Sequence, residues 1–344
     1  MEGISVSGLE PGEEGAWDSF VRNVPEATFF HLSGWRRVIE KAFGHRTFYL
    51  VARRNREIRG VLPLTQVRSL IFGNSLISNA FCVHGGIVAD LPEARDLLAA
   101  AALEIARNLR VDCVEFRSTT VSQPNWLNRD NLYVTFRRAM SAEADANLKA
   151  IPRKQRAMVR KGIANGLKSE IDNDVGRLHH IYAESVRRLG SPVFPRRYFQ
   201  LLKDEFGQAC DVVTVSHGKR AIASVMNFYF RDEVLPYYGG GLIRARALAG
   251  NDFMYWEVMR RACERGYRIF DFGRSKIGTG SYDFKHNWGF EPMRLSYEYL
   301  PINAKEIRDV NPLNPRYRVA IGLWRRLPLS LTKLIGPAIV RSIG

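Results

Sequence analysis

The segment DFGRSKIGTGSYDFKHNWGF, residues 271–290, says more about the fold than any other stretch of this chain. The preceding run, 267–272, has the composition of a buried strand, and it leads into a polar loop rich in glycine. In α/β folds, polar and flexible residues that follow a buried strand often bind ligands or act in catalysis. Lys285 lies between Phe284 and Trp288 in the sequence, so we expect aromatic rings to hold its charge away from free solvent.

The elements around this segment occur twice along the chain. Each half reads as a helix, a strand hairpin, a glycine-rich segment, a second helix and a closing strand, which is a mixed α/β unit. The first copy comprises 33–43, 48–52, 60–67, 92–109 and 111–116, and the second comprises 196–206, 211–215, 221–230, 251–265 and 268–272. We therefore predict an α/β fold made by duplication, with domains at 1–140 and 141–302 and a separate tail at 303–344.

Positive charge is concentrated in two segments. The formal net charge is +16, and residues 151–168 and 311–344 each hold six basic residues and no acidic one. A local positive surface favours a polyanionic partner, such as nucleotide phosphates, RNA or an anionic membrane, although a basic face can also be merely solvated.

The cysteine residues and the lengths of the apolar segments indicate the cellular compartment of the protein. Cys82, Cys113, Cys210 and Cys263 are scattered beside apolar residues, as buried free thiols are, which indicates a reducing environment. No apolar signal segment opens the chain, and no run is long enough to span a bilayer. We expect a cytoplasmic protein.

Several familiar chemistries lack their motifs, including the nucleophile elbow, the P-loop and a ladder of metal ligands. What remains is a polar cluster after strand 268–272. Arg274 and Lys285 could stabilise charge on a carbonyl oxygen or a phosphate, and Asp283 or Asp271 could accept a proton. The other candidate binding residues of this cluster are Phe284, Tyr282 and His286. The alternative is a salt-bridged structural loop.

Three further segments are candidates for binding. Tyr238, Gly239 and Gly240 form either a tight turn or a place where a ligand or another backbone approaches closely. A basic helix begins after Pro152, and its cations could grip a diphosphate or RNA. These cations are Lys154, Arg156, Arg160 and Lys161.

In the tail, 311–344, helical spacing puts one set of apolar residues on a single face opposite the basic residues, and Pro328 divides it into two helices. That apolar set is Ala320, Leu323, Trp324, Leu327, Leu331, Leu334 and Ile335. Such a helix lies on an anionic bilayer or packs on its own domain.

With these features, residues 15–344 resemble the FemAB/FemX-like transferases, which are built from two GNAT-like domains. The amino-acid sequences of 271–290 and of the tail are most similar to those of FemAB-like proteins that accompany exosortase/PEP-CTERM and exopolysaccharide systems. The resemblance implies transfer of an acyl or aminoacyl group to an amine, with Phe284 and Lys285 at the reaction centre. It also implies roles in binding for the basic helix and for the segment 238–240.

The resemblance implies a phosphorylated or lipid-linked acceptor from the cell envelope or an exopolysaccharide pathway, and no permanently bound cofactor. The donor stays open between acyl-CoA, an acyl carrier and aminoacyl-tRNA, because no long coiled-coil hairpin and no GNAT pyrophosphate signature occur in the sequence. Two alternatives are a non-catalytic basic module that binds RNA or assembly partners, and a peripheral scaffold on the inner face of the membrane.

Overall fold

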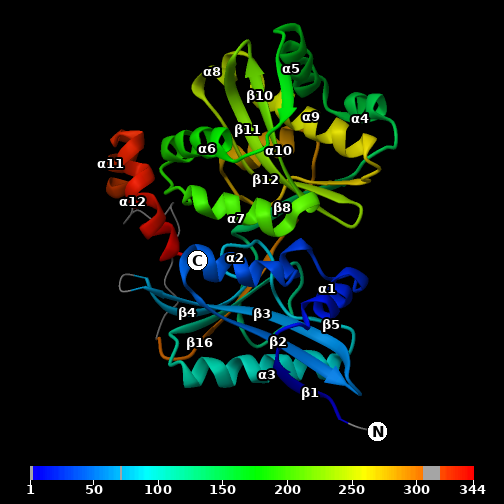
Figure 1. The fold of residues 1–344 in the computed structure, drawn as a ribbon, viewed down its shortest axis with the longest axis vertical. Coiled ribbons are helices and arrows are strands. Elements are labelled where there is room, and N and C mark those ends of the chain that lie inside the picture. Colours follow the sequence, from blue (N-terminus) through cyan, green and yellow to red (C-terminus); the bar gives the residue numbers. More distant parts are fainter. Residues whose placement is uncertain (1–2, 70–71, 305–317) are drawn as a thin grey trace. The chain divides into compact units, whose positions relative to one another are not determined.

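The computed structural model describes residues 3–69, 72–304 and 318–344. The chain forms two compact units, which are described separately here (Figure 1). The first unit comprises Met1–Leu132, Arg294–Val310 and Arg341–Gly344, and the second comprises Tyr133–Met293 and Asn311–Val340.

The first unit is a mixed sheet with helices packed on it. Its strands run in the order β1-β2-β3-β4-β6-β16-β7, and β5 pairs with β3. The β2–β3 pair is the expected hairpin, and the expected helix after it becomes α3. The bounds are β1 Ser5–Gly8, α1 Glu14–Asn23, α2 Gly34–Phe43, β2 Arg46–Arg54, β3 Glu57–Ser69, β4 Gly73–Ser78, β5 Val88–Ala89, α3 Pro92–Asn108, β6 Cys113–Ser118, β7 Leu127–Arg129 and β16 Ser296–Pro301.

The second unit repeats this plan. Its strand order is β14-β8-β13-β12-β11-β10-β9, with β15 paired to β8. The bounds of its strands are β8 Tyr133–Ala139, β9 Lys168–Ile171, β10 Cys210–His217, β11 Arg220–Phe230, β12 Glu233–Gly241, β13 Ile269–Asp271, β14 Ser275–Lys276 and β15 Pro292–Arg294. The bounds of its helices are α4 Ala144–Ala150, α5 Arg153–Ala164, α6 Gly176–Leu189, α7 Arg196–Phe206, α8 Ile243–Ala247, α9 Gly250–Glu264, α10 Gly280–Asn287, α11 Arg318–Arg326 and α12 Leu329–Arg341.

Two strands belong to the other sheet than the predicted ranges 1–140 and 141–302 would place them in. β8 precedes residue 140, yet it pairs with β13 and β14 in the second sheet. β16 precedes residue 302, yet it pairs with β6 and β7 in the first sheet. Each sheet is therefore completed by a strand from outside the stretch of chain that forms most of it.

The second sheet holds its parallel pair beside the cluster predicted from the sequence. β12 and β13 pair in parallel at Glu233↔Ile269 and Val234↔Phe270, at the start of both strands. β12 then continues along β11 to Gly241, whereas β13 ends at Asp271 and is followed by the loop that leads to α10. The polar residues thus follow a buried strand, as the sequence predicts, and the structure shows that this strand belongs to a parallel pair.

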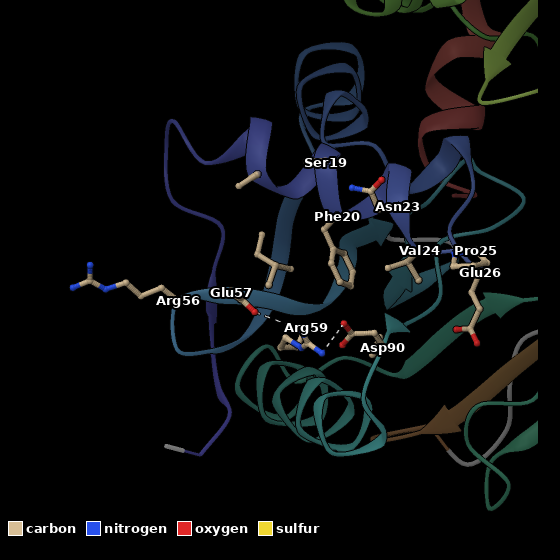
Figure 2. Close-up of a pocket in the computed structure, with 13 residues that line it drawn as sticks. Ser19, Phe20, Asn23, Val24, Pro25, Glu26, Arg56, Glu57, Arg59 and Asp90 are labelled. Carbon is tan, nitrogen blue, oxygen red and sulfur yellow. Dashed lines mark ion pairs between the residues drawn. The ribbon is translucent and has the colours of Figure 1, made fainter. Parts of the chain in front are cut away.

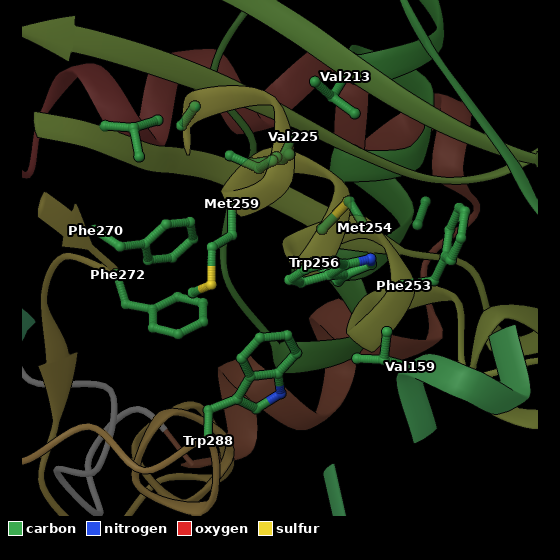
Figure 3. Close-up of a cluster of buried hydrophobic side chains, with 14 of the residues drawn as sticks. Val159, Val213, Val225, Phe253, Met254, Trp256, Met259, Phe270, Phe272 and Trp288 are labelled. Carbon is green, nitrogen blue, oxygen red and sulfur yellow. The ribbon is translucent and has the colours of Figure 1, made fainter. Parts of the chain in front are cut away.

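An apolar core holds the end of β13 and α10 in place (Figure 3). Phe270 and Phe272, from β13 and its end, pack edge-to-face with ring centroids 4.8 Å apart. Trp288, which follows α10, lies 5.7 Å from Phe272 and is fully buried, as is Phe290. Both rings anchor the C-terminal end of α10. The four cysteines are also buried and free, as predicted.

The tail forms two helices, α11 and α12, on either side of Pro328, as expected. Of the segment 311–344, residues 311–317 lie outside the described residues. Within the described part of the chain, no helix has the length and apolarity needed to cross a bilayer.

Candidate functional site

Lys285 lies in α10 with its ammonium group turned inward. Thr279 caps the start of this helix by accepting a hydrogen bond from the Tyr282 amide. The Lys285 side chain is only 8% exposed. Its Nζ donates to the carbonyl oxygens of Gly273, at 2.9 Å, and Arg274, at 3.0 Å. The loop after β13 therefore binds the lysine of the helix that follows it.

The aromatic surroundings of Lys285 differ from the expectation. Its Nζ lies 5.8 Å from the ring centroid of Phe136, which belongs to β8. The two rings that flank it in sequence serve the core instead: Phe284 packs 5.5 Å from Tyr255, and the Trp288 Nε1 donates to Asp252 Oδ1 at 3.0 Å. Phe284 directly precedes Lys285 and so points to another side of the helix, while Trp288 is drawn into the core; the ring near the charge comes from a distant strand.

The pKa of Lys285 is lowered to about 7, chiefly by burial; the negative charge of Asp271 opposes this shift, and the positive charge of Arg274 adds to it. A pKa near neutrality lets this amine exchange a proton under physiological conditions. Such a shift, caused by burial beside a specific carboxyl group, is typical of functional sites, although structural ion pairs also produce it.

Asp271 is the acidic partner that the structure brings to this lysine. It ends β13 and is buried. Its Oδ1 accepts hydrogen bonds from the Gly273 amide, at 2.7 Å, and from the Thr135 hydroxyl, at 3.1 Å. Burial raises the pKa of the Asp271 carboxyl group, which these two hydrogen bonds and the nearby cations Arg137 and Lys285 lower. A buried carboxyl group with a raised pKa is suited to accept a proton.

Three polar residues at this site were not singled out from the sequence. Thr135 and Arg137 lie on one face of β8 because side chains alternate along a strand. Arg137 is the cross-strand neighbour of Asp271, and its guanidinium binds the Glu233 carboxylate through Nε at 3.0 Å and Nη2 at 2.8 Å. The alternation of polar residues in the sequence of β8 was the available signal, but it does not reveal the partner strand.

Other candidates on the α10 side lie outside this buried pair. Asp283 is two positions from Lys285, which places it on the opposite side of the helix, where it is exposed. His286 is also exposed and stacks on Tyr282 with ring centroids 6.1 Å apart. The Arg274 guanidinium lies 4.6 Å from the ring centroid of Tyr133. The geometry thus favours Asp271 over Asp283 as the group that acts with Lys285.

The segment 238–240 is part of strand β12, so the prediction of a tight turn is wrong. Tyr238 is buried, and its hydroxyl bonds to that of Tyr198 at 2.8 Å. A Cβ at Gly240 would lie 2.8 Å from Ser185 Cβ and 3.2 Å from Tyr182 Cα, both in α6. A Cβ at Gly239 would lie 3.1 Å from the Tyr255 hydroxyl oxygen. At Gly240 the close approach is made by α6, and binding of a ligand by this segment stays a prediction.

The predicted basic helix is α5, and it shows a packed side and a charged side. Val159 is buried, and Gly162 lies where a Cβ would meet Phe253 Cβ at 2.7 Å. Arg156 is half-buried and donates to the Lys149 carbonyl oxygen at 2.6 Å. The remaining cations of interest are exposed, namely Lys154, Arg160 and Lys161.

A separate depression of about 990 Å³ lies in the first unit (Figure 2). Its charged lining residues bind one another: Arg59 pairs with Asp90 at 3.1 Å and with Glu57 at 3.6 Å. Glu26, on its rim, is paired with Arg95 at 3.0 Å. None of the residues predicted for the site lines this depression. Four of its five charged lining residues are thus engaged in ion pairs.

Comparison with known proteins agrees with this architecture. Residues 153–286 match the acetyltransferase (GNAT) domain family. The solved structure of FemX is 15% identical, with a TM-score of 0.67 over 92% of this chain and 100% of FemX. A tandem GNAT protein from the clavulanic acid biosynthesis pathway is 12% identical, with a TM-score of 0.56 over 87% of this chain and 98% of its own.

The C-terminal domain of a putative lysylphosphatidylglycerol synthetase from Agrobacterium fabrum is 12% identical, with a TM-score of 0.54 over 83% of this chain and 91% of its own. No curated protein sequence matches the chain. The chain therefore has a mixed α/β fold of two tandem GNAT-like domains, shared with FemX, and the matched GNAT domain contains both Lys285 and Asp271.

Proposed function

We propose that this protein transfers an acyl or aminoacyl group to an amino group of a phosphorylated or lipid-linked precursor of the cell envelope or an exopolysaccharide. The observation that carries the proposal is that Lys285 and Asp271 are both buried near the end of β13 and influence each other electrostatically, within the segment that matches the GNAT domain. The names of two relatives, FemX and putative lysylphosphatidylglycerol synthetase, support aminoacyl transfer and a lipid-linked acceptor.

In the proposed reaction the acceptor nitrogen attacks the carbonyl carbon of the donor. The carbonyl oxygen becomes an oxyanion, which the Lys285 ammonium group stabilises at short range in a site of low dielectric. Asp271 accepts the proton that the nitrogen loses as its bond to carbon forms. The bond from carbon to the sulfur or oxygen of the donor then breaks, and the departing group takes a proton.

The surrounding residues have positioning roles in this proposal. Thr135 and the Gly273 amide orient the Asp271 carboxyl group by binding the same oxygen, Oδ1. Arg137, held by Glu233, adds a positive charge near that carboxyl group. Arg274 is a candidate for binding a phosphate of the substrate, since guanidinium groups bind phosphate oxygens well.

The test compares Lys285→Ala with Lys219→Ala, which alters an exposed lysine in the β10–β11 turn. Mass spectrometry first identifies small molecules or tRNA that copurify with the wild-type protein, and transfer is then measured with that donor class and amine acceptors. We expect Lys285→Ala to lose transfer while Lys219→Ala retains it. A folded Lys285→Ala protein with full activity would remove Lys285 from the mechanism.

A second candidate function is binding of RNA without catalysis, favoured by the exposed cations of α5. In that case affinity for RNA falls steeply with salt concentration, Arg160→Gln weakens binding at every RNA sequence, and no donor is consumed. Turnover of a donor by the wild-type protein would exclude this alternative.

A further inference from the structure

The helices of the tail pack on the second unit through one face only. The helix α11 lies beside α6 (Figure 1), and the buried Trp324 donates through Nε1 to the Ser191 carbonyl oxygen at 3.1 Å. Arg187 of α6 donates to the carbonyl oxygens of Arg325 and Leu327, each at 3.1 Å. Gly336 of α12 lies against Val193, where a Cβ would meet the backbone nitrogen at 3.0 Å.

A second apolar face of the same helices remains exposed. On α12 the side chains of Leu331, Leu334 and Ile335 are 39%, 75% and 36% exposed, and their spacing puts them on one side of the helix. On α11 the side chains of Val319 and Leu323 are 75% and 60% exposed and lie four residues apart. We call these five residues the outer face.

This division corrects the single apolar face expected from the sequence. Trp324 was grouped with Leu323 and Leu334, but the tryptophan is buried and the two leucines are not. Contact with the second unit was one of the two roles considered for the tail, and the buried residues fulfil it. Between 36% and 75% of each outer-face residue stays exposed, so packing within the chain leaves much of this apolar surface uncovered.

The charge around the outer face indicates what covers it. Arg326 is exposed, and it shares a side of α11 with Leu323, three residues before it. Arg325 instead donates to the Leu189 carbonyl oxygen at 3.2 Å, and the sequence from 311 to 344 contains no acidic residue. Apolar side chains with cations at their margin suit an anionic bilayer surface, whereas a second copy of the same face would bring like charges together.

We propose that the outer face of α11 and α12 docks on an anionic lipid surface, with its leucine side chains inserted and Arg326 near the phosphates of the lipid headgroups. This surface is separate from the Lys285 site and does not depend on its chemistry. It goes beyond the proposed function because it places the full-length enzyme at a bilayer, whatever acyl group is transferred.

The test is flotation of the full-length protein with vesicles made of equal parts phosphatidylglycerol and phosphatidylcholine, compared with vesicles of pure phosphatidylcholine. We expect binding to the anionic vesicles that weakens with added salt. Leu334→Glu is expected to weaken it at least about tenfold, because an inserted leucine contributes roughly that much. Val121→Glu, which adds the same charge at a 52% exposed apolar residue in the first unit, is the control and is expected to bind like the wild type.

Arg326→Gln is expected to lower binding to anionic vesicles about fivefold, as for one cation near a charged surface. Lys219→Gln removes an exposed cation elsewhere on the second unit and serves as its control. Circular dichroism confirms that each variant is folded, and Lys285→Ala is expected to float like the wild type even if transfer is lost.

Three results would overturn the proposal. One is absence of binding to the anionic vesicles at low salt. Another is equal binding by Leu334→Glu and the wild type. The third is a dimer in size-exclusion chromatography that Leu334→Glu converts to a monomer, without any binding to vesicles, because the outer face would then be an interface between two copies of the chain.

Discussion

Replacing Lys285 by methionine should change how the stability of the protein depends on pH. Burial lowers the pKa of this lysine from 10.5 to about 7. Between these two values the unfolded chain holds a proton that the folded chain has released, so the free energy of unfolding rises with pH. With about 1.4 kcal/mol for each pKa unit, the lysine contributes a rise of about 2 kcal/mol between pH 7 and pH 9. Lys285→Met removes this contribution.

The measurement is urea unfolding of both proteins at pH 7, 8 and 9, with Lys219→Met as the control for an exposed lysine. The variant also leaves the Gly273 and Arg274 carbonyl oxygens without their donor, which adds an offset that does not change with pH. For this reason the change with pH of the difference between wild type and variant is the informative quantity. A constant difference from pH 7 to pH 9 would refute the burial of a readily deprotonated lysine at this position.

Three further predictions concern the site and its scaffold. If the ammonium form of Lys285 acts, kcat/KM of the wild type falls as pH rises through about 7. Lys285→Arg stays charged and should lack this decline. A wild-type kcat/KM that rises through pH 7 contradicts the role. Asp271→Asn should slow transfer about 100-fold or more while Asp283→Asn stays within a few-fold, and the reverse order in steady-state rates would transfer the role of base to Asp283. Gly240→Ala should lower the free energy of unfolding by about 1–3 kcal/mol in urea titrations, because its Cβ would press on α6. Gly322→Ala, with open space around it, should not lower this free energy. Equal effects of the two variants would show that the α6 contact can relax.

Local patterns in the sequence predicted much of this fold. The helix 196–206 has the bounds of α7, and the helix 251–265 differs from α9 by a single residue at each end. Periodicity and glycine stops are properties of a short window, so they could be read without a structure. The repeat of these elements was sufficient to predict two mixed α/β units.

Long-range pairing could not be read in the same way. Arg137 and Asp271 are neighbours because β8 pairs with β13, across more than 130 positions of the sequence. A tight turn was one reading of the segment 238–240 because glycine is common in turns, but the segment is a strand, and its Gly240 allows the close packing of α6 on β12. Partner identity in a sheet is set by tertiary packing, and a single sequence carries little information about it.

The position of β16 has a consequence for synthesis of the protein. This strand lies between β6 and β7, and β6 ends at Ser118 while β16 begins only at Ser296. A nascent chain therefore holds β6 with one hydrogen-bonding edge open until the ribosome has made nearly all of the second unit. The N-terminal unit cannot complete its sheet by folding first, so a chain truncated before Ser296 exposes that edge to aggregation and to chaperones.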